Sequence, residues 1–278
     1  MRAHEFLPIV VCSSVLALVL APQAAVQGSQ AGAHSRAIPA LVPPLLRVLV
    51  PAYFYPVPNS PWVRLSAAAA AFPQRISAIG DPANGPGASV DPNYSAVFQN
   101  FRASGGTLLG YVYTSYGARP QSTVIADIDA WFAMYPIDGI FLDEMDNTPG
   151  AHEAYYQALY QHVHALLPAA PVVGNPGVST SPSYLDYQGK RVVSTLCIQE
   201  SGAGFFNWHS DAWVASHPRN DFYALPYAMP ASSWQAAVDH AFAEHCGWVF
   251  VTDDTLPNPW DTLPAYFESM VTYIQATY

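Results

Sequence analysis

Short apolar runs of the kind that form β-strands recur along the chain, most of them about thirty residues apart. That interval accommodates one strand, one helix and two loops. The fifth and sixth runs are only about twenty residues apart, so we expect a short helix or a turn between them. The runs begin near Leu45, Ile76, Thr107, Ile137, Val172, Val192, Phe222 and Trp248.

Amphipathic helices are predicted between these runs. The clearest apolar stripe repeats at i, i+4, i+7, i+8 and i+11, which places its members on one helical face. Its members are Val124, Ile128, Trp131, Phe132 and Tyr135. Comparable stripes cover residues 155–163, 234–242 and 263–274.

The alternation of strands with helices predicts the fold class. Strands that alternate with amphipathic helices form parallel sheets, and eight such units close into a barrel. The competing fold is an open, doubly wound sheet, but no glycine-rich dinucleotide motif or P-loop follows the first strand. We therefore expect an α/β fold, a single-domain (β/α)8 TIM barrel over residues 45–278.

The first 33 residues are typical of a secretory signal peptide. Arg2 provides a basic start, residues 7–20 are largely apolar, and Ala31-Gly32-Ala33 fits a cleavage site. The run is short for a membrane anchor, which needs about 20 apolar residues. An arm rich in alanine and proline follows at residues 34–44. We expect a secreted protein with no membrane association once the signal is removed.

Composition excludes some classes of partner. Twenty acidic residues oppose ten basic ones and give a formal net charge of −10. Nucleic acid is therefore an unsuitable partner, because its phosphates require clustered lysine and arginine. The many tyrosine, phenylalanine and tryptophan residues suit sugar rings, but they equally suit an ordinary core.

The stretch from Ile137 to Glu144 points to a functional site. Residues 140–142 can form a strand that is buried on both faces. A buried unpaired carboxylate is costly, so Asp143 and Glu144 are expected where this strand leaves the core. That edge is where barrels and open α/β sheets bind ligands. The plainer interpretation is a helix cap or a surface salt bridge.

In a barrel, the residues that follow each strand converge on one face. Like charges held close together raise pKa values, so one acid can stay protonated beside an ionised neighbour. Hydrolysis of a glycosidic bond requires such a pair. In strand order the candidates are Tyr53 and Tyr55, Asp81 and Asn84, Tyr113 and Tyr116, Asp143 and Glu144, Asn175, Glu200, Tyr227, and finally Asp253 and Asp254.

Several candidates have alternative interpretations. Asp253 and Asp254 could cap the turn that follows them. Tyr53 and Tyr113 could be core aromatics, and Asn175 belongs to an Asn-Pro-Gly turn. These alternatives remain open at the level of sequence.

Other chemistries are not indicated. His162 and His164 are two apart on a predicted helix and cannot face one metal ion. No Gly-x-Ser-x-Gly motif is present. We expect no metal and no cofactor. Cys197 and Cys246 could form a disulfide in a secreted protein, but their apolar surroundings favour two buried free thiols.

With these residues identified, the chain resembles the spherulation-specific, spherulin-type family of secreted glycoside hydrolases. The resemblance covers nearly all of residues 45–278. It rests on Leu49 to Pro56, Asn84 to Gly87, Asp91 to Tyr94, Gly110 to Gly117, Asp138 to Glu144, Asn175 to Gly177, Glu200, and Val251 to Asp254.

The resemblance implies a (β/α)8 barrel that acts on galactosamine-containing exopolysaccharide, cleaving α-linked N-acetylgalactosamine within the chain. It implies Asp143, Glu144 and Glu200 as the working carboxylates. Two positions depart from the family pattern: Asp81 precedes Pro82 where asparagine is usual, and Gln199 replaces the usual aromatic residue before Glu200.

Our hypothesis from the sequence is a monomeric, secreted glycosidase that binds polysaccharide. Asp143 is the nucleophile or electrostatic stabiliser, Glu200 is the general acid/base, and Glu144 orients substrate or tunes its neighbour. One alternative is a carbohydrate-binding barrel without turnover. Another is a chitinase-like enzyme, although Phe141 occupies the first acidic position of the Asp-x-Asp-x-Glu pattern.

Overall fold

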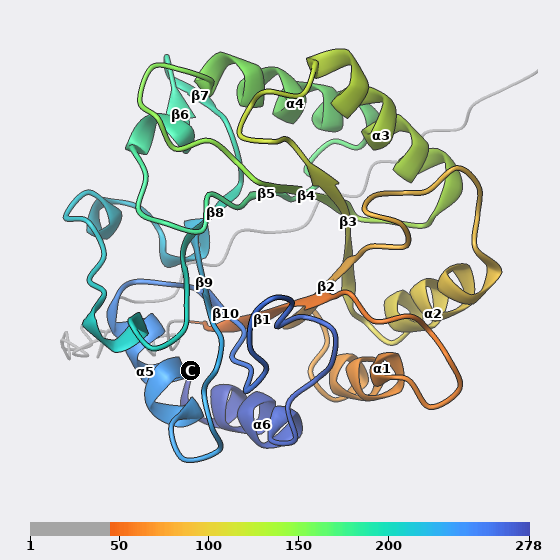
Figure 1. The fold of residues 1–278 in the computed structure, drawn as a ribbon, viewed down its shortest axis with the longest axis vertical. Helices are drawn as coiled ribbons and strands as arrows, with labels where there is room; N and C mark the ends of the chain where they lie inside the picture. The colour runs from red at the N-terminus through yellow and green to blue at the C-terminus, as the bar shows by residue number, and fades with distance from the viewer. Residues whose placement is uncertain (1–44) are drawn as a thin grey trace, which may run out of the picture. The chain divides into compact units, whose positions relative to one another are not determined.

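The computed structural model describes residues 45–278, which form a closed barrel of eight parallel strands. The signal and the arm predicted at residues 1–33 and 34–44 lie outside the described residues. In Figure 1 the strands enclose the centre and the helices lie outside them. Around the barrel the order is β1-β10-β9-β8-β5-β4-β3-β2. The predicted fold class is confirmed.

The strands begin within three residues of the predicted positions. They are β1 (Arg47–Ala52), β2 (Ile76–Gly80), β3 (Thr107–Tyr113), β4 (Gly139–Asp143), β5 (Val172–Gly174), β8 (Thr195–Ser201), β9 (Phe222–Pro226) and β10 (Trp248–Val249). The α-helices are α1 (Pro61–Ala71), α2 (Pro92–Ala103), α3 (Gln121–Met134), α4 (Glu153–Leu166), α5 (Trp234–Ala243) and α6 (Phe267–Thr277).

Two of the seven connections between successive barrel strands lack an α-helix. The short connection between β5 and β8 contains a 3-10 turn, η1 (Pro182–Tyr184), and a hairpin of β6 (Asp186–Tyr187) and β7 (Lys190–Arg191), as its length predicted. The connection between β8 and β9 contains only three 3-10 turns, η2 (Phe205–Asn207), η3 (Val214–Ser216) and η4 (Arg219–Asp221). The expectation of a full helix there is wrong, because the segment has no helical apolar stripe and Pro218 interrupts it.

Local sequence explains how the helices begin and pack. Asp91 caps α2, accepting hydrogen bonds from the backbone amides of Asn93 at 2.8 Å and Tyr94 at 3.4 Å, and Pro92 follows at the first helical position. On the outer face of β3, Gly110 leaves room for the Trp131 ring, which a Cβ would approach to 2.5 Å. Close contact between strand and helix at this point therefore requires glycine.

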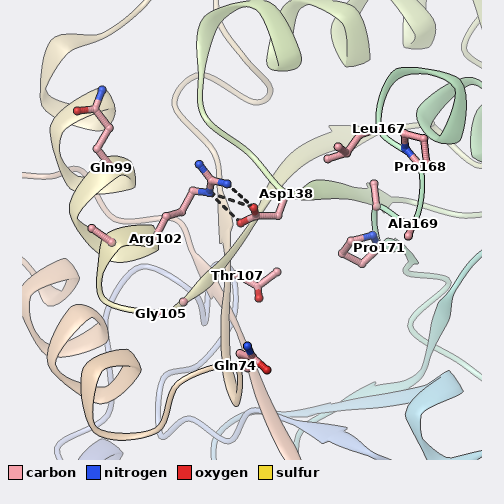
Figure 2. A pocket seen from close by; sticks show the side chains of 13 residues that line it. Gln74, Gln99, Arg102, Gly105, Thr107, Asp138, Leu167, Pro168, Ala169 and Pro171 are labelled. Atoms are coloured by element: carbon pink, nitrogen blue, oxygen red, sulfur yellow. Dashed lines mark hydrogen bonds and ion pairs between the residues drawn. The ribbon is translucent and has the colours of Figure 1, made fainter. Parts of the chain in front are cut away.

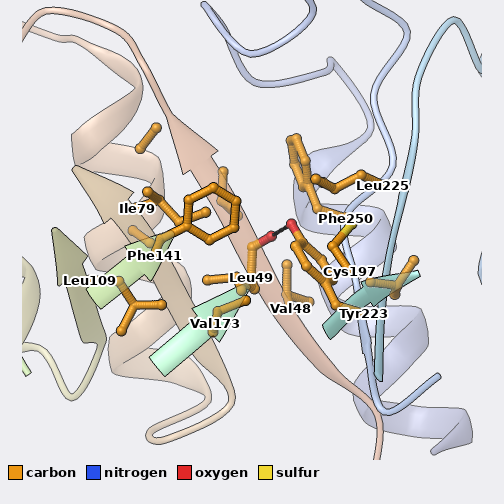
Figure 3. Close-up of a cluster of buried hydrophobic side chains, with 14 of the residues drawn as sticks. Val48, Leu49, Ile79, Leu109, Phe141, Val173, Cys197, Tyr223, Leu225 and Phe250 are labelled. Carbon is orange, nitrogen blue, oxygen red and sulfur yellow. Dashed lines mark hydrogen bonds between the residues drawn. The ribbon is translucent and has the colours of Figure 1, made fainter. Parts of the chain in front are cut away.

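The barrel interior is a packed core. Figure 3 shows side chains from opposite strands meeting at its centre, among them Leu49, Phe141 and Phe250. The Tyr223 hydroxyl donates a hydrogen bond to the Leu49 carbonyl across this core. Cys197 and Cys246 are buried free thiols, as expected. Because the interior is filled, a ligand site must lie above it, at the end of the strands.

Candidate active site

Three neighbouring strands bring two carboxylates and one amide together at the C-terminal end of the barrel. Asp143 ends β4, Asn175 directly follows β5, and Glu200 lies near the end of β8. Nδ2 of Asn175 donates to Oδ1 of Asp143 and to Oε2 of Glu200, each at 2.9 Å. The two carboxylate oxygens are therefore separated by no more than twice this distance.

A turn of left-handed backbone directs Asp143. Glu144 has a φ of +48°, which turns the chain away from the strand. Its carbonyl accepts 2.7 Å hydrogen bonds from the Thr114 hydroxyl and the Tyr116 backbone amide. The β3–α3 loop thus holds the end of β4 in place while the Asp143 side chain points into the barrel mouth.

A β-bulge directs Glu200. Cys197 pairs with Tyr223, but Gln199 pairs with the next residue of β9, so Ile198 is an extra residue in β8. Glu200 is then paired with Leu225, whose side chain lies in the barrel interior. If this sequence ran as a regular strand without the bulge, Gln199 would face inward instead of Glu200, because side chains alternate along a strand.

The surroundings raise the pKa of both acids. Burial raises the pKa of Asp143, and the charge of Glu144 adds to this effect; hydrogen bonds from the Glu144 amide, Tyr111 and Asn175 act against it. Burial and the charge of Asp143 raise the pKa of Glu200, while Asn175 and Trp260 lower it. Asp143 has more donors to stabilise its ionised form, so Glu200 is the better proton carrier.

A cavity of about 300 Å³ surrounds the pair. Tyr116 and Leu256 stand at its edges and are 61% and 65% exposed. Within residues 45–278 they are the two most exposed large apolar side chains, and both line the cavity. The full lining is Tyr116, Asp143, Glu144, Asn175, Pro176, Gly177, Glu200, Tyr227 and Leu256.

Six of the residues singled out in the sequence line this cavity: Tyr116, Asp143, Glu144, Asn175, Glu200 and Tyr227. Tyr53 and Asp81 are not in the lining, although the charge of Asp143 raises the pKa of both. For Asp81, burial is the larger cause and brings the pKa to about 6.

The remaining residues lie elsewhere. Tyr55 is bonded to Asp91 and Asn93 at the start of α2, at 3.1 and 2.8 Å. Asn84 and Tyr113 line a second cavity. Asp253 and Asp254 follow β10 without lining the cavity, which agrees with their alternative interpretation as turn residues.

Sequence reasoning missed two aromatic residues at the site. Tyr111, whose pKa is raised by burial and by Asp143, contacts the acid, and Trp260 faces Glu200. Tyr111 could have been found, because residues two apart on a strand share one face and Tyr113 was already a candidate. Trp260 lies in the irregular segment before α6, where no periodicity gives its direction.

A surface hollow of about 760 Å³ lies at the opposite end of the barrel, and Figure 2 shows it from close by. Its central acid, Asp138, is held by Arg102 through contacts of 2.6 to 3.0 Å and accepts the Leu108 amide at 2.8 Å. Arg102 and Asp138 neutralise each other, so this hollow offers no reactive group despite its size.

Two further properties concern only residues 45–278. No cluster of three or more histidine, cysteine or acidic side chains there is arranged to hold a metal ion. No helix in that range has the length and apolar character needed to cross a membrane.

Comparison with known proteins finds one family profile and one curated relative that resemble most of this chain. The sequence profile of spherulation-specific family 4 matches residues 47–274. Spherulin-4 of Physarum polycephalum is 28% identical over 243 residues, which cover 83% of this chain and 70% of that protein.

Solved structures show the same architecture. Sph3 of Aspergillus clavatus, crystallised in complex with GalNAc, superimposes with a TM-score of 0.72 at 23% identity, covering 84% of this chain and 98% of that one. The cyclic α-maltosyl-(1→6)-maltose hydrolase of Arthrobacter globiformis gives 0.51 at 11% identity, covering 84% and 81%. These two likenesses concern the barrel fold.

Proposed function

The chain belongs to spherulation-specific family 4, and we propose that it is a secreted glycoside hydrolase acting on galactosamine-containing exopolysaccharide. The bond cleaved is that of α-linked N-acetylgalactosamine. One observation carries the proposal: a single amide holds two carboxylates of raised pKa at the floor of an open cavity. A binding protein has no need of such a pair.

Each acid has a distinct role. Asp143 attacks the anomeric carbon while Glu200 protonates the departing glycosidic oxygen, which leaves a glycosyl ester on Asp143. Glu200, now ionised, removes a proton from water as the water attacks the anomeric carbon and releases Asp143. Glu144 lines the cavity beside the nucleophile and orients the sugar.

Asn175 is a positioning residue in this scheme. Its Nδ2 fixes both carboxylates, whereas its Oδ1 is buried and has no hydrogen-bond partner among the described residues. The opposite amide orientation would turn Oδ1 toward both carboxylates, which is unfavourable when they are ionised. The orientation with Nδ2 toward the acids is therefore the one that stabilises both ionised carboxylates.

The separation of the acids supports retention of anomeric configuration. Retaining glycosidases hold their carboxyl groups about 5 Å apart, whereas inverting enzymes leave about 6.5 to 9.5 Å for a water molecule. The shared Asn175 contacts limit the two bonded oxygens to less than the inverting range. We therefore expect the first product to carry the substrate's α configuration, as NMR spectroscopy would detect.

The substrate is inferred from the relatives. The Sph3 structure contains GalNAc, and the cavity here has space for a sugar residue between the apolar edges Tyr116 and Leu256. Secretion is inferred from the signal-like sequence at residues 1–33.

Replacing either acid by its amide tests the function. On partially deacetylated galactosaminogalactan, Asp143→Asn and Glu200→Gln should each lower kcat by about 10³-fold or more, since acid–base catalysis alone contributes about 10²- to 10⁴-fold. Asp138→Asn, at the other end of the same strand, is the matched control and should retain activity per folded molecule.

Three outcomes would contradict the proposal. Undiminished release of oligosaccharides by both amide variants would remove these acids from the mechanism. Binding by the wild-type protein without any product would indicate a carbohydrate-binding barrel. Preferential cleavage of chitin oligomers would indicate the chitinase-like alternative.

A further inference from the structure

A second cavity of about 280 Å³ lies at the same end of the barrel, beside strands β2 and β3. Its size is close to that of the acid cavity, but no residue is shared between the two linings. It is lined by Ala83, Asn84, Gly85, Pro86, Gly87, Tyr113, Arg119 and Asp127.

The β3–α3 loop forms a wall of both cavities. Tyr116 faces the acid cavity, while Tyr113 and Arg119, at either end of the same loop, face the second one. Tyr113 is paired in register with Asp143, so the end of β3 lies directly beside the proposed nucleophile. The two cavities are therefore lined by residues of one loop.

Asp81, directly after β2, supports the loop that lines the second cavity. Its Oδ1 accepts a 2.7 Å hydrogen bond from the Gly85 amide, which holds the loop of residues 83–87. Burial and, to a smaller extent, the charge of Asp143 raise the pKa of its carboxyl group. The loop is thereby held at the end of β2.

The second cavity contains a preformed ion pair. Arg119 donates through Nη2 to Oδ2 of Asp127 and through Nη1 to the Tyr113 carbonyl, each at 2.7 Å. Its guanidinium carbon lies 3.9 Å from the centroid of the Tyr113 ring. Three contacts thus orient the guanidinium group: the Asp127 carboxylate, the Tyr113 carbonyl and the Tyr113 ring. Its remaining N–H donors keep a fixed geometry.

The charge balance indicates the kind of ligand. Arg119 and Asp127 neutralise each other, in contrast to the acid cavity, where Asp143, Glu144 and Glu200 have no cationic partner among residues 45–278. The Asp127 side chain remains 29% exposed, so its carboxylate is accessible. A neutral ligand with neighbouring hydroxyl or amide groups would match these donors and acceptors.

We propose that the second cavity is a distal subsite that binds an uncharged sugar residue of the polysaccharide, through Asn84, Arg119 and Asp127. This inference rests on the proposed function, because it assigns the cavity to the same substrate chain. Ala83 and Pro86 supply the apolar contacts that a sugar's C–H face requires.

The test measures binding separately from cleavage. Affinities for N-acetylgalactosamine trisaccharide and hexasaccharide are measured by calorimetry in the Asp143→Asn background, where the substrate is not consumed. Asp127→Ala should weaken hexasaccharide binding about tenfold, the effect of one hydrogen bond to a charged group, and trisaccharide binding much less.

Asn84→Gly is a second variant. Asn84 has a φ of +54°, which glycine adopts without strain, so the backbone is preserved while the side chain is removed. It should weaken hexasaccharide binding about threefold, as expected for one neutral hydrogen bond. Asp129→Ala is the matched control: it lies on the same helix and loses an ion pair with His162 outside the cavity.

The outcomes separate the two proposals. Absence of turnover by the wild-type protein on every glycan would reject the glycosidase, whatever the affinities. If Asp127→Ala and Asn84→Gly bind both oligosaccharides as their parent does, the subsite is rejected, whether or not the wild-type protein cleaves.

Discussion

The two ends of the barrel treat buried charge in opposite ways. At the N-terminal end, Asp138 precedes β4 and is bonded to Arg102 at 2.6 Å, and Asp221 precedes β9 and is bonded to Arg191 at 2.7 Å. At the C-terminal end, Asp143 and Glu200 share only an amide, and within residues 45–278 neither forms a salt bridge.

Acids are therefore stabilised by cations at the N-terminal end of the barrel and lack a cationic partner among the described residues at the C-terminal end. Strand β4 has an acid at each end, one paired with a cation and one without. In barrels of this class, the N-terminal end contributes stability and the C-terminal end contributes chemistry. Unpaired acids at the C-terminal end lower stability, and we expect their replacement to show it.

The largest effect on this comparison should follow from removing Asn175, the amide that donates to both acids where the described part of the chain places no cation. Asn175→Ala should lower kcat about 10²-fold, because both acids lose a donor and their fixed orientation. Since that hydrogen bond lowers both pKa values, its loss should move the acidic limb of the pH–rate profile to higher pH. An unchanged profile would refute the positioning role.

The matched control for this variant is an amide at the other end of the barrel. Asn220 accepts a 2.7 Å hydrogen bond from Arg47, far from the acid pair in the fold. Asn220→Ala should leave both kcat and the pH–rate profile as they are.

A smaller effect, on stability, is expected from neutralising Asp81. Its pKa is raised from 3.8 to about 6 in the folded state, so its ionisation opposes folding. The stabilising contribution of the protonated form is complete below pH 3.8 and is lost as the pH rises through about 6.

Asp81→Asn should therefore raise the free energy of unfolding by about 1–2 kcal/mol at pH 7.5, after allowance for solvent screening, and much less at pH 4. The asparagine oxygen can still accept the Gly85 amide. Urea titrations at the two pH values provide the measurement, and an equal change at both would contradict the explanation.

The smallest effect is expected at the paired end. Arg102→Ala should lower the free energy of unfolding by about 1 kcal/mol, because both partners of this pair are partly exposed. The change should shrink in high salt, whereas kcat of the folded protein should stay constant. A large loss of kcat would show that the two ends are coupled.

The fold was predictable because its signals are repeated. Eight apolar runs separated by helical stripes leave little freedom in topology, and most strands begin at or near the predicted residue. The lack of an α-helix between β8 and β9 was not predicted. The length of this segment permits a helix, and the evidence against one is the absence of an apolar stripe together with Pro218.

The site was predictable only in part. Strand ends identified Asp143, Asn175 and Glu200, since the topology brings them to one edge. The placement of Tyr55 depends on a bond to Asp91, and that of Trp260 on an irregular segment. Neither contact follows from periodicity, so side chains on long loops could not be placed from the sequence.

The extra residue at Ile198 has an evolutionary consequence. Deletion of Ile198 would remove the bulge and leave Glu200 paired with Leu225, whereas insertion of one residue beside it would turn the acid out of the barrel mouth and silence the protein while preserving its shape. A duplicated copy could in this way become a sugar receptor in one mutational step. Relatives that have gained a residue between Cys197 and Glu200 are where such a conversion would be found.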